Sequence, residues 1–413
     1  MMSLFHPAST HTGDAPACDA LLARYQPGDQ LFASPSGTLL GQGVACAIAP
    51  DAPRQTTRAA AARALNAQVQ ALLHEAEHTH GIQRPVAMGA VPFDVRRPAR
   101  LSVPRQLHIG QAPQAGDALA APLHVKAERA TPSPDPAVYE AAVVDALARF
   151  QRGELDKVVL ARALDLQLDH APDRRALLGR LAQKNLNGYT FAIALPDGEG
   201  HGREPAAFIG ATPELLVRRV GTRVVVNPLA GSAARRALPD EDQLAGQRLL
   251  ASAKDRREHA VVIDAVVQAL KPLCRTLHMP EGPSLLATDA LWHLSTTLTG
   301  ELADPATTAL DLALALHPTP AVCGQPVDRA FSVIEALEPV DRGLFAGFVG
   351  WCDAQGDGEW AVSLRCAELR GRSLRLHAGA GIVPGSDPRS ESQETGTKFR
   401  TMLSALGMVS SVD

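Results

Sequence analysis

The sequence predicts an α+β protein whose sheets are mainly antiparallel and flanked by helices. Strand-like runs follow one another across short turns, as in Leu215–Leu229 with its turn at Gly221-Thr222. Helical runs interrupt the strands without the strict strand–helix–strand alternation of a doubly wound parallel sheet. The chain has 413 residues, 46% of them hydrophobic and 20% charged. That composition is typical of a globular protein with a sizeable core, in one large domain or two average ones.

The first 110 residues are predicted to form strands and one helix, and they precede a Pro/Ala/Gly-rich stretch that has two interpretations. Residues 1–27 are polar and contain prolines, which predicts a loosely ordered N-terminal segment. Short strand-like runs alternate with glycines from Asp29 to Ala49. The Pro/Ala/Gly-rich stretch 111–136 is either an interdomain linker or a surface excursion. The elements expected before it are a helix over Ala59–His80 and strands over Val86–Phe93 and Leu101–Ile109.

The longer remainder of the chain continues the mixture of helices and hairpins. One long helical region is predicted from Glu241 to Cys274. A three-stranded meander is predicted between Leu344 and Val383, with turns at Asp353–Gly358 and Arg370–Ser373. The other expected elements are helices over Ala137–Arg152 and Arg174–Lys184 and strands over Asp156–Leu168, Thr190–Leu195 and Ala206–Gly210.

Charge and cysteine usage argue against several classes of protein. A net charge of -4, without a run of Lys and Arg interleaved with aromatics, gives no support for nucleic-acid binding. The six cysteines are scattered and include no C-x-x-C pair, which favours reduced thiols over a disulfide framework or a zinc site. No signal peptide is evident, and the apolar run Ala260–Leu270 is short and interrupted by Asp264. We therefore expect a soluble cytoplasmic protein with no membrane partner.

A helix near the C-terminus is expected to turn two carboxylates inward. Ser390 and Gln393, three residues later, form a capping-box pattern that predicts the start of this helix. Glu391, Glu394 and Lys398 stand at i, i+3 and i+7 and therefore share one face. Apolar side chains continue that stripe toward the C-terminus, so the charged groups should meet the core. Two inward carboxylates require a positively charged partner.

A third carboxylate is expected to face the core from the long helix. Glu258 falls within the apolar stripe that includes Val262. A salt bridge to Lys254 at i−4 is one explanation for its burial. The other is a Mg²⁺ ion shared with Glu391 and Glu394, because hard cations prefer carboxylate oxygens and water. Such an ion would also let an anionic substrate approach the acidic groups.

Arg365 is the expected anchor for a substrate anion. In the predicted strand Trp360–Ala367 it shares a face with Ala361, Ser363 and Ala367, whose small side chains leave room for a guanidinium. Arginine suits bidentate capture of a carboxylate. The alternative is a solvated arginine on an exposed sheet face.

The glycine-rich stretch 379–385 fits neither the G-x-G-x-x-G nor the P-loop pattern. It is either a turn packed against the site or a loop whose amides contact a ligand anion. Gly396 could serve the same purpose, since glycine in a helix costs about 1 kcal/mol relative to alanine. Lys157, on a buried strand, and Glu214, after another, are individually compatible with ordinary salt-bridge roles.

Eight segments of the chain together point to a known family. They are Asp156–Arg162, Ile209–Leu216, Pro228–Ala233, Ala253–His259, Leu316–Ala321, Gly347–Trp351, Gly379–Pro384 and Gln393–Lys398. In this order they resemble the chorismate-utilising enzymes, the anthranilate synthase component I/isochorismate synthase family. The match is strong from about residue 150 to the end. Glu338–Arg342 and Gly350–Asp353 look most like siderophore-type isochorismate synthases.

The resemblance implies one large α+β domain, here residues 28–413, with 111–136 as a surface excursion. It also implies that Mg²⁺ is held by Glu258 and Glu394, with Glu391 adjacent, and that this ion holds the ring carboxylate of chorismate. Three further sets of residues are implied for the substrate pocket. They are Arg365 for the enolpyruvyl carboxylate, His317 in the lining, and Lys398, Gly379, Gly381, Ile382, Ala230, Gly231 and Ser232 for the remaining contacts, to which Gly396 is added on the helix argument above.

Two residues receive catalytic roles from the resemblance. Lys157 matches the general base that activates water to attack ring carbon 2. Glu214 matches the general acid that protonates the departing 4-hydroxyl. These roles require a neutral Lys157 and a raised pKa at Glu214.

The expected activity is therefore a Mg²⁺-dependent isochorismate synthase that isomerises chorismate, in the service of siderophore biosynthesis. A salicylate synthase, which goes on to eliminate pyruvate, is the alternative. An aminating chorismate enzyme and a catalytically silent binding homologue come further behind. Lys157 argues against the aminating branch, so no glutaminase subunit is expected. A monomer is compatible with the sequence.

Overall fold

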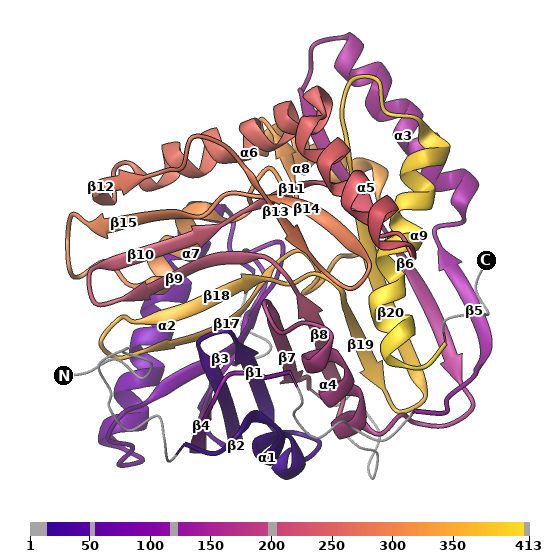
Figure 1. Cartoon of the computed structure of the whole chain (residues 1–413). Coiled ribbons are helices and arrows are strands. Elements are labelled where there is room, and N and C mark those ends of the chain that lie inside the picture. Colours follow the sequence, from indigo (N-terminus) through magenta and orange to yellow (C-terminus); the bar gives the residue numbers. More distant parts are fainter. Residues whose placement is uncertain (1–14, 50–53, 116–122, 197–204, 409–413) are drawn as a thin grey trace.

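The computed structural model describes residues 15–49, 54–115, 123–196 and 205–408. All strand pairings among these residues are antiparallel, and they connect seventeen strands into one extensive, strongly curved sheet (Figure 1). Three further strands form a small second sheet. The large sheet contains β1 (Gln30–Ser34), β2 (Gly37–Ala47), β3 (Val86–Val91), β4 (Arg100–Gly110), β5 (Ala127–Ser133), β6 (Lys157–Leu168), β7 (Tyr189–Ala194), β8 (Ala207–Thr212), β9 (Leu215–Val220), β10 (Arg223–Asn227), β12 (Cys274–His278), β15 (Leu298–Leu302), β16 (Gly324–Gln325), β17 (Phe348–Asp353), β18 (Gly358–Val362), β19 (Cys366–Arg370) and β20 (Ser373–Ile382). The small sheet contains β11 (Leu229–Ala234), β13 (Ser284–Ala287) and β14 (Leu291–Ser295).

Helices cover the outside of the sheets, as Figure 1 shows. Several begin at a side chain that accepts a hydrogen bond from the first turn, which satisfies an amide that the helix leaves free. Thr57, Asp173 and Thr308 do so for α2 (Arg58–His78), α4 (Arg174–Gln183) and α7 (Ala309–Leu316). The helices are α1 (Cys18–Arg24), α2 (Arg58–His78), α3 (Pro136–Gln151), α4 (Arg174–Gln183), α5 (Pro239–Ala251), α6 (Ala253–Leu270), α7 (Ala309–Leu316), α8 (Val327–Leu337) and α9 (Pro388–Ala405). The predicted α+β class is confirmed.

The long pair β6–β20 joins the two apolar clusters of the core. Its register runs without interruption from Gln167 opposite Ser373 to Val158 opposite Ile382. Side chains near the first end of the pair pack in the cluster that includes α4 and α9. Side chains near the other end pack in a second cluster, which includes α2, α7 and α8. The start of β6 is therefore held rigidly between packed layers.

Most predicted elements match the structure to within a few residues, but three local predictions are wrong. The long helix over Glu241–Cys274 is two helices, because Ser252 ends α5 and its side chain caps α6 by accepting from the Asp255 amide. The meander has four strands, because residues 363–365 interrupt the run that was predicted as one strand, with Arg365 at φ +48°. The cap of α9 is Asp387 and not Ser390, whose amide donates to the Asp387 carboxylate at 2.8 Å.

The N-terminal segment and the stretch 111–136 are only partly described. Residues 1–14 and 116–122 lie outside the described residues. The predicted loose order does not extend to residue 27, because Cys18–Arg24 form α1 with Cys18 and Leu21 buried. Within 111–136, β5 pairs with β6 and is largely exposed. The domain boundaries themselves stay a prediction. Within the described parts of the chain, helices that combine the length and apolarity of a membrane span are absent.

Candidate active site

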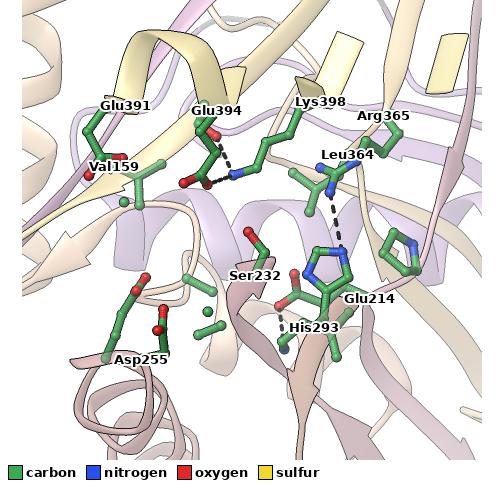
Figure 2. A pocket seen from close by; sticks show the side chains of 18 of the residues that line it. Val159, Glu214, Ser232, Asp255, His293, Leu364, Arg365, Glu391, Glu394 and Lys398 are labelled. Atoms are coloured by element: carbon green, nitrogen blue, oxygen red, sulfur yellow. Dashed lines mark hydrogen bonds and ion pairs between the residues drawn. The ribbon is translucent and has the colours of Figure 1, made fainter. Parts of the chain in front are cut away.

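A single pocket collects most of the charged residues that the sequence analysis selected. It lies where β6 and β20 of the large sheet meet β11 and β14 of the small sheet beneath α6 and α9. Figure 2 shows Glu391, Glu394 and Lys398 projecting from α9, with Arg365 next to Lys398 and with Glu214 and His293 below them. The lining residues are Val159, Pro213, Glu214, Leu229, Ala230, Gly231, Ser232, Lys254, Asp255, Glu258, His293, Ala321, Leu364, Arg365, Gly379, Gly381, Glu391, Glu394 and Lys398.

Two lysines hold two of the pocket carboxylates. Lys157 Nζ, on a residue that is only 2% exposed, donates to Glu258 Oε1 at 2.8 Å. Lys398 Nζ lies 2.7 Å from Glu394 Oε1 and also donates to the Gly379 carbonyl at 2.8 Å. The charged partner of Glu258 is therefore Lys157, a residue 101 positions earlier, and not Lys254.

The glycines of β20 make the Lys157–Glu258 contact possible. Gly379 and Gly381 belong to a strand and not to a loop, which corrects the loop interpretation. A Cβ atom at Gly381 would lie 2.8 Å from Glu258 Oε1 and 3.2 Å from Lys157 Cε. Any larger side chain would thus displace the ion pair. On the facing strand, Gly231 has φ +79° beside the irregular register of β11, which only glycine adopts readily.

The three acidic residues on α6 and α9 carry donors that suit a hard divalent cation. Glu391 is buried, and burial raises the pKa of its carboxyl, opposed by a hydrogen bond from Ser386. Burial also acts to raise the pKa of Glu394, but Lys398 and Arg365 outweigh it and hold that pKa below its usual value. Oxygens of Glu258, Glu391 and Glu394 do not all lie within 4.8 Å of one another. Mg²⁺ keeps several waters, which can bridge such separations, so the donor set fits Mg²⁺.

Glu214 combines full burial with a single weak hydrogen bond to its carboxylate. It follows β8, is 3% exposed, and accepts from the Leu229 amide at 3.5 Å. Burial raises the pKa of Glu214 to about 7, although the Leu229 amide and the charge of Lys157 oppose the increase. A substantial fraction of the residue is therefore protonated at neutral pH. That is the state a general acid needs.

Arg365 reaches the pocket through an unusual backbone conformation. Its φ of +48° breaks the regular alternation of side chains that was predicted for one strand over Trp360–Ala367. The Arg365 carbonyl accepts a hydrogen bond from the Ala211 amide at 3.1 Å. Burial lowers the pKa of the guanidinium to about 10, against the charges of Glu394 and Glu214. The group remains charged at neutral pH, where it can bind a carboxylate.

His293 is a pocket residue that the sequence analysis missed. It lies on β14 opposite Ser232 of β11, and Arg365 Nη2 is 3.5 Å from its Nε2. Burial, followed by the charges of Arg365 and Lys398, lowers the pKa of His293 well below its usual value. The imidazole is therefore neutral, with Nε2 as an acceptor. A lone histidine in an apolar strand gives no signal until its pairing partner is known.

Four predicted residues do not line the pocket, and one of them, Lys157, meets it through its contact with Glu258. His317 donates from Nε2 to the Phe93 carbonyl at 3.0 Å and packs against Phe348, while burial lowers its pKa to about 4. Ile382 is fully buried at the end of β20. Gly396 lies inside α9, where a Cβ would point toward Arg162 Nη2 at 3.8 Å. His317, Ile382 and Gly396 thus lie outside the lining of this pocket, and their roles in substrate binding stay predictions.

Comparisons with known proteins identify the family of this chain. Residues 102–407 match the family model described as "Chorismate binding enzyme". The chain is 49% identical over 397 residues to isochorismate synthase DhbC of Bacillus subtilis, covering 94% of this chain and 96% of that protein. It is 45% identical over 335 residues to isochorismate synthase EntC of Escherichia coli K12, covering 79% and 83%. A crystal structure assigned to 2,3-dihydroxybenzoate-specific isochorismate synthase, DhbC, of Bacillus anthracis superposes with a TM-score of 0.86 at 43% identity, covering 94% and 99%. The chain belongs to the chorismate binding enzyme family.

Proposed function

We propose that this protein is an isochorismate synthase, an isomerase that converts chorismate to isochorismate. The observation that carries the proposal is the buried Glu214 carboxyl, with its pKa near 7, in a pocket whose lining residue Glu258 contacts the buried Lys157 amine. A buried acid and a buried base whose charges influence each other suit the addition of one hydroxyl group and the loss of another. The relatives named above, which the chain matches over most of its length, are isochorismate synthases.

Binding of a dicarboxylate is supported by the distribution of charge in the pocket. We assign Arg365, with its guanidinium free of a carboxylate contact among the described residues, to the enolpyruvyl carboxylate. Glu258, Glu394 and Glu391 would hold Mg²⁺. That ion supplies the positive charge that binds the ring carboxylate. Lys398, together with Ala230, Gly231 and Ser232 of β11 and Gly379 and Gly381 of β20, forms the rest of the wall.

The two proposed catalytic residues come from different strands, since Lys157 begins β6 and Glu214 follows β8. Water adds to ring carbon 2 and passes a proton to Lys157 Nζ at the start of β6. The bond between carbon 4 and its oxygen breaks, and Glu214 protonates the departing hydroxide to give water. Lys157 acts as a base only when neutral, and it must then release the Glu258 carboxylate that it contacts in this structure. No net oxidation occurs, so no redox cofactor is needed.

We further propose a cytoplasmic enzyme that serves siderophore biosynthesis and works without a glutaminase subunit. Support for the siderophore assignment is the match, at 40% identity over 379 residues, to the vibriobactin-specific isochorismate synthase of Vibrio cholerae. The buried Lys157 supports the use of water in place of ammonia, because the amine occupies the position of the base.

The test is product analysis with purified protein, chorismate and Mg²⁺, with and without ammonia. We expect isochorismate in both reactions, with turnover lowered by about 10²–10⁴-fold in Lys157→Ala and Glu214→Gln and unchanged in Lys184→Ala. Lys184 is the matched control, because it forms an ion pair with Asp289 at a partly exposed site. Salicylate with pyruvate would instead identify a salicylate synthase. An aminated product or no turnover in the wild type would refute the proposal.

A further inference from the structure

A cysteine, a glutamate and a histidine come together at the C-terminal end of α2, outside the pocket described above. One ligand atom from each of Cys46, Glu75 and His80 lies within 4.8 Å of the other two. Within the described ranges, no other three histidine, cysteine or acidic side chains meet this condition. The cluster combines residues of β2 with residues of the α2 terminus, so the spacing of cysteines in the sequence gives no hint of it.

The backbone fixes His80 above the last turn of α2. Beyond the end of the helix, the amides of Thr79 and His80 both donate to the Glu75 carbonyl, at 2.9 and 3.4 Å. Gly81 follows with φ +68°, and the Ile82 amide donates to the Ala76 carbonyl at 3.0 Å. His80 is thus folded back toward the helix, with Nε2 at 3.7 Å from Glu75 Oε1.

Cys46 approaches the same point from beneath the helix. The register of β2 against β4 shifts between Val44 and Cys46, and such irregularities re-aim the side chains beside them. The residue is 8% exposed, and its Sγ donates to the Leu72 carbonyl at 3.4 Å. Burial, with a smaller contribution from the charge of Glu75, raises the pKa of the Cys46 thiol.

The three donors match the preferences of Zn²⁺. Zinc takes thiolate, imidazole and carboxylate ligands at roughly 2.0–2.3 Å in a tetrahedral arrangement. The side chains of Glu75 and His80 are 53% and 29% exposed, so they can move inward by the small distance required. The C-terminal end of a helix is also negatively polarised, which favours a cation there. An exposed His–Glu pair alone contributes little and would not involve the buried thiol.

We propose that Cys46, Glu75 and His80 form a zinc site that fastens the C-terminal end of α2 to β2, with water as the fourth ligand. Binding displaces the thiol proton, so one proton is released for each ion bound through Cys46. The site uses soft and borderline donors. It is therefore chemically distinct from the carboxylates of the catalytic pocket, which suit a hard cation.

The experiment uses Co²⁺ as a spectroscopic substitute for Zn²⁺, with the full-length protein in excess Mg²⁺ so that the pocket carboxylates are satisfied. We expect one equivalent of Co²⁺ to produce a thiolate-to-metal charge-transfer absorption, which Zn²⁺ then displaces. Cys46→Ser should abolish this absorption. His80→Gln should weaken binding by more than the roughly 10–100-fold that is typical for the loss of an outer-shell partner.

Matched controls separate this site from other donors on the chain. Cys274→Ser removes another buried cysteine, and His170→Gln removes a histidine that pairs with Asp169 alone. The double variant His74→Gln, His78→Gln removes two stacked histidines of α2 that could bind metal by themselves. All three variants should keep the absorption. Its loss in the double variant, or its survival in Cys46→Ser, would overturn the proposal.

Unfolding in a chelator and chorismate turnover complete the test. Without metal, His80→Gln should unfold like the wild type, because the pair with Glu75 is the one side-chain contact of His80 among the described residues and it is partly exposed. Zn²⁺ should raise the unfolding temperature of the wild type but not that of His80→Gln. Turnover of chorismate with Mg²⁺ should be unchanged in this variant, so the result does not depend on the proposed activity. Equal stabilisation of both proteins by Zn²⁺ would contradict the site.

Discussion

Glu214 and Glu394 are the same residue type in the same pocket, yet their pKa values move in opposite directions. Among the described residues, the Glu214 carboxylate has one hydrogen-bond donor, the Leu229 amide at 3.5 Å, and burial raises its pKa to about 7. Burial acts on Glu394 as well, but the Lys398 amine at 2.7 Å more than compensates and lowers its pKa. The surroundings thus prepare one carboxyl to donate a proton and the other to remain an anionic ligand.

The first prediction concerns the pH dependence of turnover. Because a general acid must be protonated, kcat/KM should fall as the pH rises through about 7, the pKa of Glu214 in the free protein. Glu214→Gln should lower kcat by about 10²–10⁴-fold and remove this limb. Steady-state rates between pH 5.5 and 9 provide the measurement. An unchanged limb in the variant would assign the titration to another group.

The second prediction concerns stability at the same residue. Between the ordinary pKa of 4.5 and about 7, folded Glu214 keeps a proton that the unfolded chain has lost. The free energy of unfolding should therefore decrease as the pH rises through this range. At about 1.4 kcal/mol per pH unit, the wild type should lose about 3 kcal/mol relative to Glu214→Gln between pH 4.5 and 8. Urea unfolding of both proteins at several pH values tests this, and parallel curves would contradict it.

At the scale of elements, the first turns of α6 and α9 position the acidic residues. Ser252 caps α6 six residues before Glu258, and Asp387 caps α9 just before Glu391. A cap fixes where the helix begins and therefore which side chains of the next two turns face the pocket. The positions of the proposed metal-binding carboxylates thus depend on capping side chains that do not themselves contact the metal ion.

Replacing the capping aspartate of α9 or of α4 should lower the stability of the protein in both cases, but should weaken Mg²⁺ binding only for α9. Asp387→Ala and Asp173→Ala should each lower the free energy of unfolding by about 1 kcal/mol, because each removes a carboxylate that accepts from first-turn amides. Only Asp387→Ala should raise the Mg²⁺ concentration needed for half-maximal turnover, since α4 carries no pocket residue. Urea unfolding and Mg²⁺ titration of both variants provide the measurements. The same Mg²⁺ requirement in both would show that the start of α9 does not control the site.

The buried pair Glu338–Arg342 holds the first half of β6 in place. Glu338 accepts from the Ala161 amide at 2.7 Å. Arg342 donates from Nη2 to the Val159 carbonyl at 2.7 Å and from Nη1 to the Val322 carbonyl at 2.8 Å. These bonds fix the part of β6 that carries Lys157. The pair therefore acts on the site through the strand and not by contact with substrate.

Loss of this arginine should be costly. Arg342→Met leaves a buried carboxylate and two carbonyls without their partner, which should lower the free energy of unfolding by about 3–5 kcal/mol. The control is Arg375→Met, which breaks an equally close but exposed pair with Asp165 and should cost less than about 1 kcal/mol. Urea denaturation compares the two. A similar loss of unfolding free energy in Arg342→Met and Arg375→Met would mean that burial of the Glu338–Arg342 pair does not strengthen it.

At the scale of the whole molecule, the pocket exists because two sheets and two helices meet. The acid follows β8, the base begins β6, and the carboxylates come from α6 and α9. Lys157 and Lys398 form ion pairs with Glu258 and Glu394, so side chains of the protein itself can balance the charge of these two carboxylates. Folding and metal binding are therefore expected to be separable.

Removal of Mg²⁺ should abolish turnover but leave the protein folded. Chelation should keep the circular dichroism spectrum of the wild type unchanged, because the lysines satisfy the two carboxylates. Mg²⁺ at about 100 times its dissociation constant should raise the free energy of unfolding by about 2.7 kcal/mol. Spectra, activity and thermal unfolding with chelator and with Mg²⁺ test this together. Unfolding on chelation would make the ion part of the fold.

Local patterns in the sequence determined the elements, the antiparallel class and the inward direction of Glu258, Glu391 and Glu394. Periodicity reports these features because it depends only on neighbours within one or two turns. The family resemblance added the chemical roles of Lys157 and Glu214. Local patterns missed the helix break at Ser252 and placed the cap of α9 at Ser390 and not at Asp387. Several nearby polar residues can cap a helix, so a pattern alone does not fix its exact first residue.

Only the tertiary structure decided which groups meet. The Lys157–Glu258 pair, the His293–Arg365 contact and the Cys46–Glu75–His80 cluster each join elements that lie far apart in the chain or on different layers. The positive φ of Arg365 likewise depends on how the chain turns between β18 and β19. Strand register and layer packing fix such contacts through many long-range interactions, which no short window of sequence contains.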